Sequence, residues 1–322
     1  MKAIVIKNPG PPDVLHMSEV AKPEPGKGEV LIKVKAVGVN RADCVQRQGN
    51  YPAPKDCPKD IPGLEYAGII EDENGSDFKK GDKVFGLVGG GAYADYLVAH
   101  ARTVSLFPDK LSFVEAAALP EAFVTAYDAM VTQGKLQSGQ NVLINAAGSG
   151  VGIAAMQIAE ALGANFAGTV RSASKAEKLS AYKNLIVAPD GKISDKVLAI
   201  FPSGVDLVVE LVGGNYVNED LNCLSNKGKI ILIGLLAGRK IEIDLGKVLS
   251  KRALIQGTTL RARPLEEKIL AASLLQKNIS PLFESGKLKG CIDHVLPLSE
   301  ASKAHEIMEA NQNLGKIVLE VS

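Results

Sequence analysis

Cysteine is scarce and scattered in this sequence, which has Cys44, Cys57, Cys223 and Cys291 as its four cysteines among 322 residues. No CxxC pair and no Cys/His spacing connects them, so neither a zinc site nor a disulfide framework is indicated. Reduced thiols in a cytoplasmic protein are therefore the expected state.

The chain has no marked excess of charge of either sign, because it contains 37 Lys and Arg and 36 Asp and Glu. This balance gives no support to nucleic acid as the main partner, which would require a basic footprint. The longest stretch without charge, Leu136–Ala159, is interrupted by Gln, Ser, Gly and Asn and predicts no membrane helix. The N-terminus has four apolar residues before Lys7, too few for a signal-peptide core.

Glycine is the one residue in excess, with 32 of 322 residues, above the usual level of about 7 %. No Gly-X-Y period absorbs the surplus, so it indicates tight turns or backbone that something approaches closely. At roughly 100–200 residues per domain, the length predicts two domains.

Two kinds of pattern divide the chain. The first 120 residues contain short β-branched runs separated by Gly and Pro, which predict a β-rich domain. From Pro120, helical patterns alternate with short apolar runs, which is typical of a parallel sheet covered by helices. After Arg263 the chain returns to amphipathic helices and ends in strands. The predicted fold class is α/β, with a Rossmann-type doubly wound parallel sheet (residues 123–263) inserted in a β-rich domain (residues 1–122 and 264–322).

The strongest chemical signal is Asn141–Gly163, where a strand runs through a small-residue turn into an Ala-rich helix. Such a turn lets backbone approach a pyrophosphate, and the helix start supplies N–H groups and a positive dipole. The alternative is a tight βα turn that binds nothing. The residues expected to contact the cofactor here are Ala147, Ser149, Gly150, Val151 and Gly152.

The turn after the next strand indicates which cofactor is bound. NAD enzymes carry an acidic residue at this place, whereas this chain has Arg171, Ser172 and Lys175 and no carboxylate before Glu177. A guanidinium, a hydroxyl and an ammonium suit a 2′-phosphate. We therefore expect NADPH rather than NADH, against the alternative of a solvated basic turn.

Three segments carry a resemblance to a known family: "VGVNRADCVQRQGNYPAP" from Val37, "PEAFVTAY" from Pro120 and "EANQNLGKIVLE" from Glu309. The chain resembles the zinc-free quinone oxidoreductases, relatives of zeta-crystallin, in the medium-chain dehydrogenase/reductase superfamily. The second and third segments look like the branch induced by the p53 tumour suppressor. The resemblance implies a GroES-like catalytic domain around the inserted Rossmann sheet.

Zinc-dependent members of that superfamily have a Cys where Asn40 stands and a His-Glu pair where Leu64–Glu65 stands. Asn and Leu cannot serve as the thiolate and imidazole ligands of catalytic zinc, so we expect no metal. Without a Lewis acid, hydride transfer favours a substrate that stabilises the added electrons itself. A quinone is the first expectation and a 2-alkenal or enone the alternative. A third possibility, from another class, is an NADPH-binding structural protein without turnover.

The resemblance also implies roles for individual residues. Asn40 and Tyr51 line the catalytic pocket, with Tyr51 as the candidate proton source and a surface-loop aromatic as the alternative. Asp43 is expected to fix the turn through its own backbone bonds or, alternatively, to orient the loop or the tyrosine. Arg261 is expected either at the cofactor or, like Arg263, as a solvated surface charge. One departure is "NLIVAPDG" after the third Rossmann strand, where relatives often have a Tyr beside the adenosine phosphate. The further residues expected to contact the cofactor are Thr125, Gly234, Leu235, Thr259, Leu260, Arg261, Asn313 and Lys316.

The segment Leu245–Thr259 ends in the β-branched run "ALIQGTT". In relatives the matching edge strand pairs with its copy across a two-fold axis, and an unpaired edge otherwise invites uncontrolled association. A homodimer that acts on a small-molecule substrate is therefore expected.

Overall fold

The structure is a computed structural model that describes all 322 residues. The chain forms two compact units. The split unit consists of Met1–Val124 and Leu260–Ser322, and the inserted unit of Thr125–Thr259. The divisions expected after residues 122 and 263 lie close to these boundaries; that each unit is an independent domain stays a prediction. The helix α3 (Pro120–Tyr127) crosses the first boundary.

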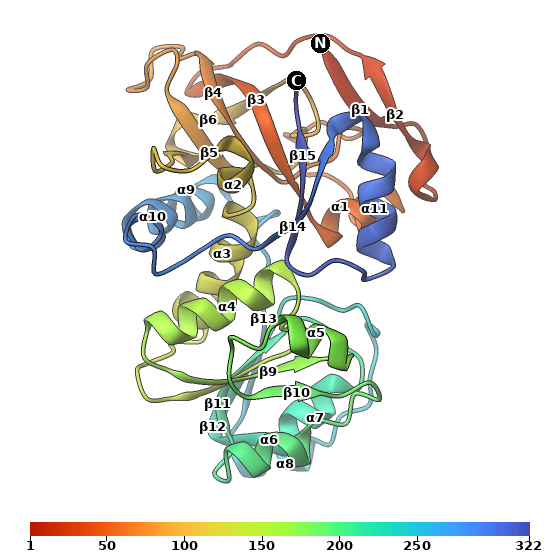
Figure 1. The fold of residues 1–322 in the computed structure, drawn as a ribbon, viewed down its shortest axis with the longest axis vertical. Helices are drawn as coiled ribbons and strands as arrows, with labels where there is room; N and C mark the ends of the chain where they lie inside the picture. The colour runs from red at the N-terminus through yellow and green to blue at the C-terminus, as the bar shows by residue number, and fades with distance from the viewer. The chain divides into compact units, whose positions relative to one another are not determined.

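The split unit is β-rich (Figure 1). Its main sheet has the order β14-β15-β3-β4-β5-β7, with β6 pairing β3. These strands are β3 (Glu29–Val39), β4 (Glu65–Asp72), β5 (Lys83–Leu87), β6 (Tyr96–His100), β7 (Val104–Leu106), β14 (Ile292–Pro297) and β15 (Lys316–Glu320). β1 (Lys2–Ile6) and β2 (Leu15–Glu19) form a separate two-stranded sheet.

The C-terminal strand completes the sheet that the N-terminal segment begins. β15 lies antiparallel to β3, with Ile317 opposite Val39. This pairing confirms the expectation that the C-terminal segment folds back onto the first domain. The helices of this unit are α1 (Arg41–Arg47), α2 (Phe113–Ala117), α9 (Leu265–Leu274), α10 (Ser280–Glu284) and α11 (Ala301–Glu309). Short helical turns are η1 (Pro12–Val14), η2 (Ala101–Thr103), η4 (Leu275–Ile279) and η5 (Leu298–Glu300).

The inserted unit is a six-stranded sheet, ordered β10-β9-β8-β11-β12-β13, in which all neighbours are parallel. This order confirms the predicted doubly wound sheet. The strands are β8 (Asn141–Ile144), β9 (Asn165–Val170), β10 (Leu185–Val187), β11 (Val205–Glu210), β12 (Leu224–Leu232) and β13 (Leu254–Gly257). The helices are η3 (Asp128–Gln133), α4 (Gly150–Ala161), α5 (Ala173–Lys178), α6 (Ser194–Ile200), α7 (Tyr216–Cys223) and α8 (Leu245–Lys251).

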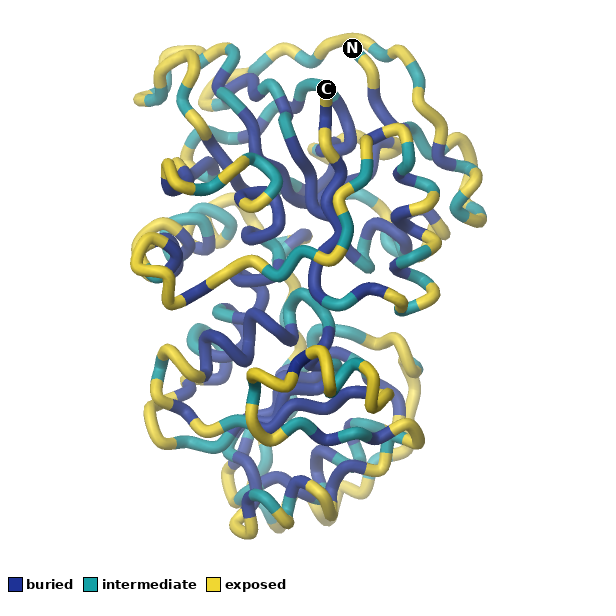
Figure 2. Tube along the Cα trace, in the orientation of Figure 1, coloured by how far each residue is buried: buried dark blue, intermediate teal, exposed yellow.

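Apolar runs form the centre of each unit (Figure 2). Val30, Ile32 and Val34 of β3 are fully buried in the split unit, and Leu143 and Val208 in the inserted unit. Burial on both faces explains why the strands of the inserted unit read as unbroken apolar runs. The strands β2 and β7 were not expected, because "LHMSE" and "VSL" are short or polar.

Candidate functional site

The turn between β8 and α4 has the geometry of a nucleotide-binding turn. Ser149 begins α4, and its hydroxyl accepts a hydrogen bond from the backbone N–H of Gly152 at 3.0 Å. A Cβ on Gly152 would lie 2.5 Å from the carbonyl oxygen of Ala146 and 2.7 Å from the Cα of Ala147. Glycine is therefore required for the helix to start against its own turn. The turn lies at the carboxyl end of β8, where β8 and β11 meet and the strand order reverses, which is where such sheets bind ligands.

A buried polar cluster lies under this turn and was missed in the sequence. The amide of Asn145 donates to Glu210 at 2.5 Å and to Asp220 at 2.9 Å, while the hydroxyl of Thr169 donates to the Asn145 oxygen at 3.0 Å. Glu210 also accepts from the N–H of Gly213 at 2.6 Å. Burial, together with the neighbouring Glu210 charge, raises the pKa of Asp220 well above its usual range. These hydrogen bonds connect the carboxyl ends of β8, β9 and β11 to one another.

The basic turn after β9 is open to solvent. Arg171 and Ser172 are exposed, and Ser172 begins α5 by accepting from the N–H of Lys175 at 3.3 Å. Nearby, the ring of Tyr216 lies over Gly191, where an added Cβ would be 3.0 Å from the ring. An aromatic ring from α7 thus lies beside the loop after β10.

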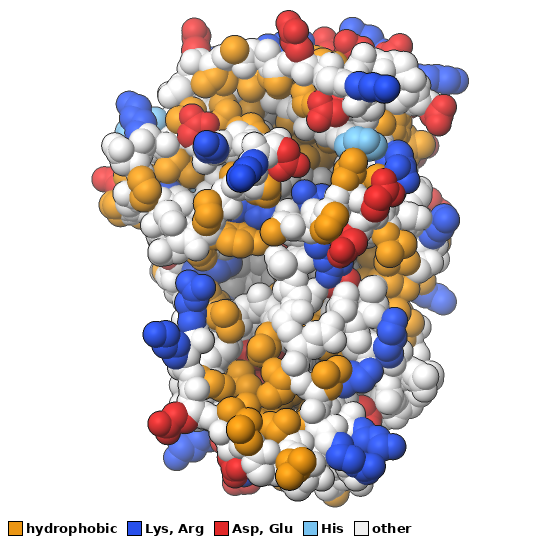
Figure 3. Space-filling model, turned by 180° about the vertical axis from the view of Figure 1, so that it is seen from behind, with side chains coloured by type: hydrophobic (Ala, Val, Ile, Leu, Met, Phe, Trp, Pro, Cys, Tyr) orange, Lys and Arg blue, Asp and Glu red, His pale blue; other side chains and the backbone are white.

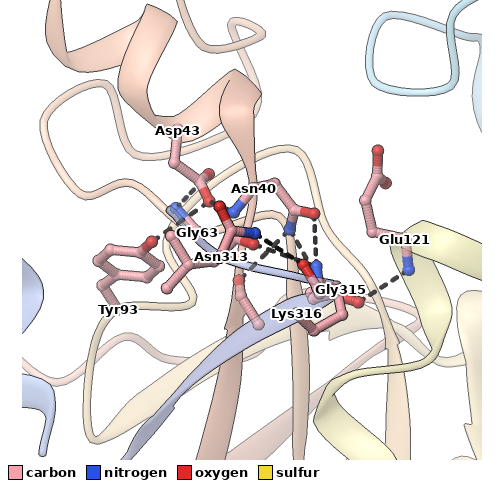
Figure 4. Close-up of polar contacts among 11 residues, drawn as sticks. Asn40, Asp43, Gly63, Tyr93, Glu121, Asn313, Gly315 and Lys316 are labelled. Carbon is pink, nitrogen blue, oxygen red and sulfur yellow. Dashed lines mark hydrogen bonds and ion pairs between the residues drawn. The ribbon is translucent and has the colours of Figure 1, made fainter. Parts of the chain in front are cut away.

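In the split unit, Asn40 precedes α1 and its side chain is fully engaged (Figure 4). Its amide donates to the Glu65 carboxylate at 2.8 Å and to the carbonyl of Gly38 at 3.3 Å. Its oxygen accepts from the ammonium of Lys316 at 2.6 Å. An amide has two N–H donors, and both are used here. Asn40 therefore shapes the site but has no donor left for a substrate oxygen.

Lys316 is buried at the same place. Its ammonium donates to Glu65 at 2.5 Å, to Asn40 at 2.6 Å and to the carbonyl of Val39 at 3.1 Å. Lys316 is 4 % exposed and Glu65 is fully buried. An ammonium has three donors, and all three are engaged inside the split unit. A role of Lys316 in cofactor binding stays a prediction. The other Glu65 oxygen accepts from the N–H of Glu121 at 2.8 Å.

Asp43 holds the start of α1. Its carboxylate accepts from the N–H of Asn40 at 2.8 Å, the N–H of Gly63 at 3.2 Å and the hydroxyl of Tyr93 at 3.3 Å (Figure 4). The expectation that Asp43 fixes the turn is confirmed. Burial raises the pKa of Asp43 to about 6, although the Asn40 N–H and the Lys316 charge oppose that rise.

The Tyr93 hydroxyl is part of a buried chain of hydrogen bonds whose donors and acceptors can be assigned. His305 Nε2 lies 3.2 Å from Tyr93 Oη, and His305 Nδ1 lies 3.3 Å from the guanidinium of Arg47. Burial lowers the pKa of His305 to about 3, so its imidazole is neutral at neutral pH. Since a guanidinium can only donate, Nδ1 accepts and the proton is on Nε2. Nε2–H therefore donates to Tyr93, whose O–H donates to Asp43. Through these bonds α11 holds α1.

Tyr51 lies in the loop after α1 and is half-buried. Arg261 donates to its carbonyl oxygen at 3.0 Å, and the guanidinium lies 4.8 Å from the ring centroid. Arg261 is 7 % exposed, so the interpretation of Arg261 as a solvated surface charge is wrong. Arg263 is largely buried and forms an ion pair with Glu267 at 3.6 Å.

The other residues expected to contact the cofactor are buried to different degrees. Thr125 and Asn313 are buried, and Asn313 donates to the carbonyl of Gly315 at 2.8 Å. Leu235 and Thr259 are exposed. A role in cofactor binding stays a prediction for all of these residues, together with the partly buried Val151, Gly234 and Leu260 and the buried Ala147.

No three His, Cys, Asp or Glu side chains come together as a group that could hold a metal ion. None of the helices combines the length and apolar character needed to cross a membrane.

Comparison with known proteins identifies the class. Residues 26–109 match the family described as "Alcohol dehydrogenase GroES-like domain", and residues 183–319 match the family described as "Zinc-binding dehydrogenase". A GroES-like β-rich unit around a doubly wound nucleotide fold defines the medium-chain dehydrogenase/reductase superfamily.

Individual relatives narrow the assignment. Quinone oxidoreductase from Lama guanicoe is 36 % identical over 330 residues, covering 99 % of this chain and 97 % of that protein. The human quinone oxidoreductase is 34 % identical over 328 residues with the same coverage. The crystal structure of Escherichia coli quinone oxidoreductase complexed with NADPH superposes with a TM-score of 0.90 at 28 % identity, covering 100 % of both chains. The chain belongs to the quinone oxidoreductase family. It is an oxidoreductase that uses a nicotinamide cofactor and a small-molecule substrate.

Proposed function

We propose that this protein reduces quinones with NADPH, without a metal ion. The observation that carries the proposal is the set of side chains where zinc-dependent relatives bind their metal. Leu64 has no donor atom, and the Asn40 amide is used up by Glu65 and Lys316. These groups do not fit a zinc ion, which takes thiolate, imidazole or carboxylate ligands. A quinone suits such a site, because its ring accepts the electrons without a Lewis acid.

Reduction of a quinone to a hydroquinone adds two electrons and two protons. When bound, the nicotinamide supplies a hydride. The second proton comes from solvent, through a donor at the pocket, and Tyr51 is our candidate for that donor. Tyr51 is half-buried, which suits a group that passes a proton between solvent and a substrate. Asn40 and Asp43 hold the start of α1, and the loop that carries Tyr51 follows the end of this helix.

NADPH rather than NADH is proposed on the basis of the turn after β9. Arg171 and Ser172 are exposed there, with Lys175 one turn into α5. A 2′-phosphate would receive charge-assisted hydrogen bonds at this turn. No Asp or Glu stands at this place to bind the ribose hydroxyls of NADH. Burial raises the pKa of Tyr216, and the charge of Arg171 is close enough to oppose that rise.

Reduction of a carbon–carbon double bond in a 2-alkenal or enone is the second candidate, because it also requires hydride delivery and stabilisation of an oxyanion. The relatives are named as oxidoreductases, which does not favour a binding protein without turnover.

A homodimer is proposed on the basis of the edge of the inserted sheet. β13 pairs only with β12, which leaves its other edge open. Beside it, Leu245 and Leu249 of α8 are 70 % and 80 % exposed, and Leu254 is 44 % exposed. Hydrophobic side chains gather on this unit in Figure 3. A second copy would cover both the edge and the leucines. Light scattering at micromolar concentration should give a dimer mass, and Leu249→Lys should lower it; a monomeric wild type would contradict the proposal.

A cytosolic location is proposed on the basis of the cysteines. All four are unpaired, and Cys44 and Cys223 serve as small buried side chains in different units. Core thiols of this kind suit a reducing compartment.

The test of the proposed function is a screen of NADPH oxidation with ortho-quinones, para-quinones and short 2-alkenals. Quinones should be turned over faster than alkenals, and Tyr51→Phe should lower the rate with the best substrate by about 100-fold. Turnover of alkenals alone would favour the second candidate. No turnover with any of the three sets would contradict both.

A further inference from the structure

Arg261 is the first buried residue after the chain returns to the split unit, and it bonds three separate segments of that unit. Its Nε donates to the carbonyl of Gly89 at 2.7 Å, after β5. One terminal nitrogen donates to the carbonyl of Tyr51 at 3.0 Å, and the other donates to the Gln46 side chain of α1 at 2.5 Å. All three nitrogens of the guanidinium are therefore engaged.

The same group also faces the ring of Tyr51. The guanidinium carbon lies 4.8 Å from the ring centroid, within the range of a cation–π contact. The main chain and the ring of Tyr51 are thus held by one cation. A lysine could not replace it, because an ammonium is a point charge on a flexible stem and lacks the planar fork.

We propose that Arg261 is a positioning residue for Tyr51, holding the phenol in place through the Tyr51 carbonyl and the face of the ring. This inference rests on the proposed function, in which Tyr51 supplies a proton. It differs from the role of cofactor ligand expected from the resemblance, because the three hydrogen bonds of the Arg261 guanidinium go to the loops and helix around Tyr51. Loss of the Arg261 guanidinium would remove the hydrogen bond to the Tyr51 carbonyl and the cation beside the Tyr51 ring.

The first part of the test needs no turnover. Protein labelled with 3-fluorotyrosine is compared by ¹⁹F NMR in the wild type, Arg261→Met, Arg261→Lys and Arg263→Met, with the Tyr51 resonance assigned by its loss in Tyr51→Phe. Arg263 is the matched control, since its ion pair is with Glu267 and not with the Tyr51 loop. The Tyr51 resonance should shift in both Arg261 variants and stay in place in Arg263→Met. An unchanged Tyr51 resonance in both folded Arg261 variants would overturn the proposal.

The second part separates positioning from cofactor binding. Arg261→Met should lower kcat by about 100-fold, the scale expected for misplacement of a reacting group by about 1 Å. The Kd for NADPH should change less than about twofold, and added guanidinium ion should restore part of kcat in Arg261→Ala. In a Tyr51→Phe background the same Arg261→Met change should lower kcat by less than about threefold, because residues that act as a unit are not additive. A Kd for NADPH raised about tenfold with kcat unchanged would overturn the proposal and make Arg261 a cofactor ligand.

Failure of the proposed function would be distinguishable. If none of the quinones supports NADPH oxidation by the wild type, the proposed function is rejected. The ¹⁹F resonance would still report whether Arg261 holds the Tyr51 ring. If Arg261→Met does not fold, Arg261→Lys keeps the charge and decides the outcome by the same resonance.

Discussion

The two units use their polar residues in opposite ways. In the split unit, Asn40, Asp43 and Lys316 are buried and bonded to one another or to the backbone around them. In the inserted unit, Arg171 and Ser172 are exposed on a turn. The comparison indicates that the polar network at the start of α1 is held in place by the fold itself, while the basic turn after β9 presents side chains that can change without disturbing the core.

The largest expected effect is the loss of the buried ion pair in the split unit. Lys316→Met would leave Glu65 as an uncompensated buried charge, which typically lowers the free energy of unfolding by about 3–5 kcal/mol. Chemical denaturation measures this loss. The control is Lys303→Met, which breaks the exposed Lys303–Glu300 pair at 3.0 Å and should cost less than about 1 kcal/mol. Equal losses in the two variants would contradict the difference between buried and exposed pairs.

The next effect concerns pH and Asp43. The pKa of Asp43 is about 6 in the folded chain, above its ordinary value of 3.8. Between about pH 4 and pH 6 the folded state therefore binds more protons than the unfolded state, so stability falls as pH rises. The free energy of unfolding of the wild type, minus that of Asp43→Asn, should fall by about 2 kcal/mol across this window. A difference that rises with pH, as for a carboxylate stabilised by an ion pair, would show that the bonds to Asp43 outweigh its burial.

A smaller effect is expected at the nucleotide turn. Gly152→Ala would place a methyl group 2.5 Å from the Ala146 carbonyl oxygen, and overpacking of this kind costs about 1–3 kcal/mol. The temperature of thermal unfolding should fall, and NADPH binding should weaken. In Gly257→Ala nothing lies within 4 Å of the new Cβ, so this variant should unfold close to the wild-type temperature. A stable Gly152→Ala protein with unchanged binding would show that the turn can relax.

The smallest expected effect is at the exposed basic turn. Arg171→Ala should raise the Kd for NADPH by about tenfold, the equivalent of one charge-assisted hydrogen bond, and leave that for NADH unchanged. Arg252→Ala is the control, because this exposed arginine of the same unit bonds Asn226 at 3.3 Å. Equal wild-type affinities for the two cofactors would reject the proposed preference for NADPH.

Local patterns predicted much of this fold. Alternating apolar runs indicated the strands β8, β9 and β11, and the small-residue turn at Ala147–Gly152 indicated the start of α4. These features depend on residues that are neighbours in sequence, which is why the sequence contains them. The expectation that Asn40 and Leu64 stand where zinc-dependent relatives bind their metal came from the family resemblance and not from a local pattern.

The buried polar network could not be predicted, because its partners are distant in sequence. Arg47 and His305 are 258 positions apart, and Asn40 and Lys316 are 276 apart. No spacing rule connects such residues. Arg261 was ambiguous for the same reason: its partners Gln46, Tyr51 and Gly89 lie in segments that only the folded sheet brings together.

The central claim is that the inserted unit sets the affinity for NADPH and the split unit sets the catalytic rate. It is tested most directly by measuring NADPH binding and kcat in parallel in Arg171→Ala and Lys316→Gln, with circular dichroism to verify folding. Glutamine at position 316 retains a donor for Glu65, which limits the loss of stability. We predict that Arg171→Ala weakens NADPH binding by about tenfold with kcat preserved, and that Lys316→Gln lowers kcat with binding preserved. Weaker NADPH binding in Lys316→Gln, together with unchanged binding in Arg171→Ala, would contradict the account.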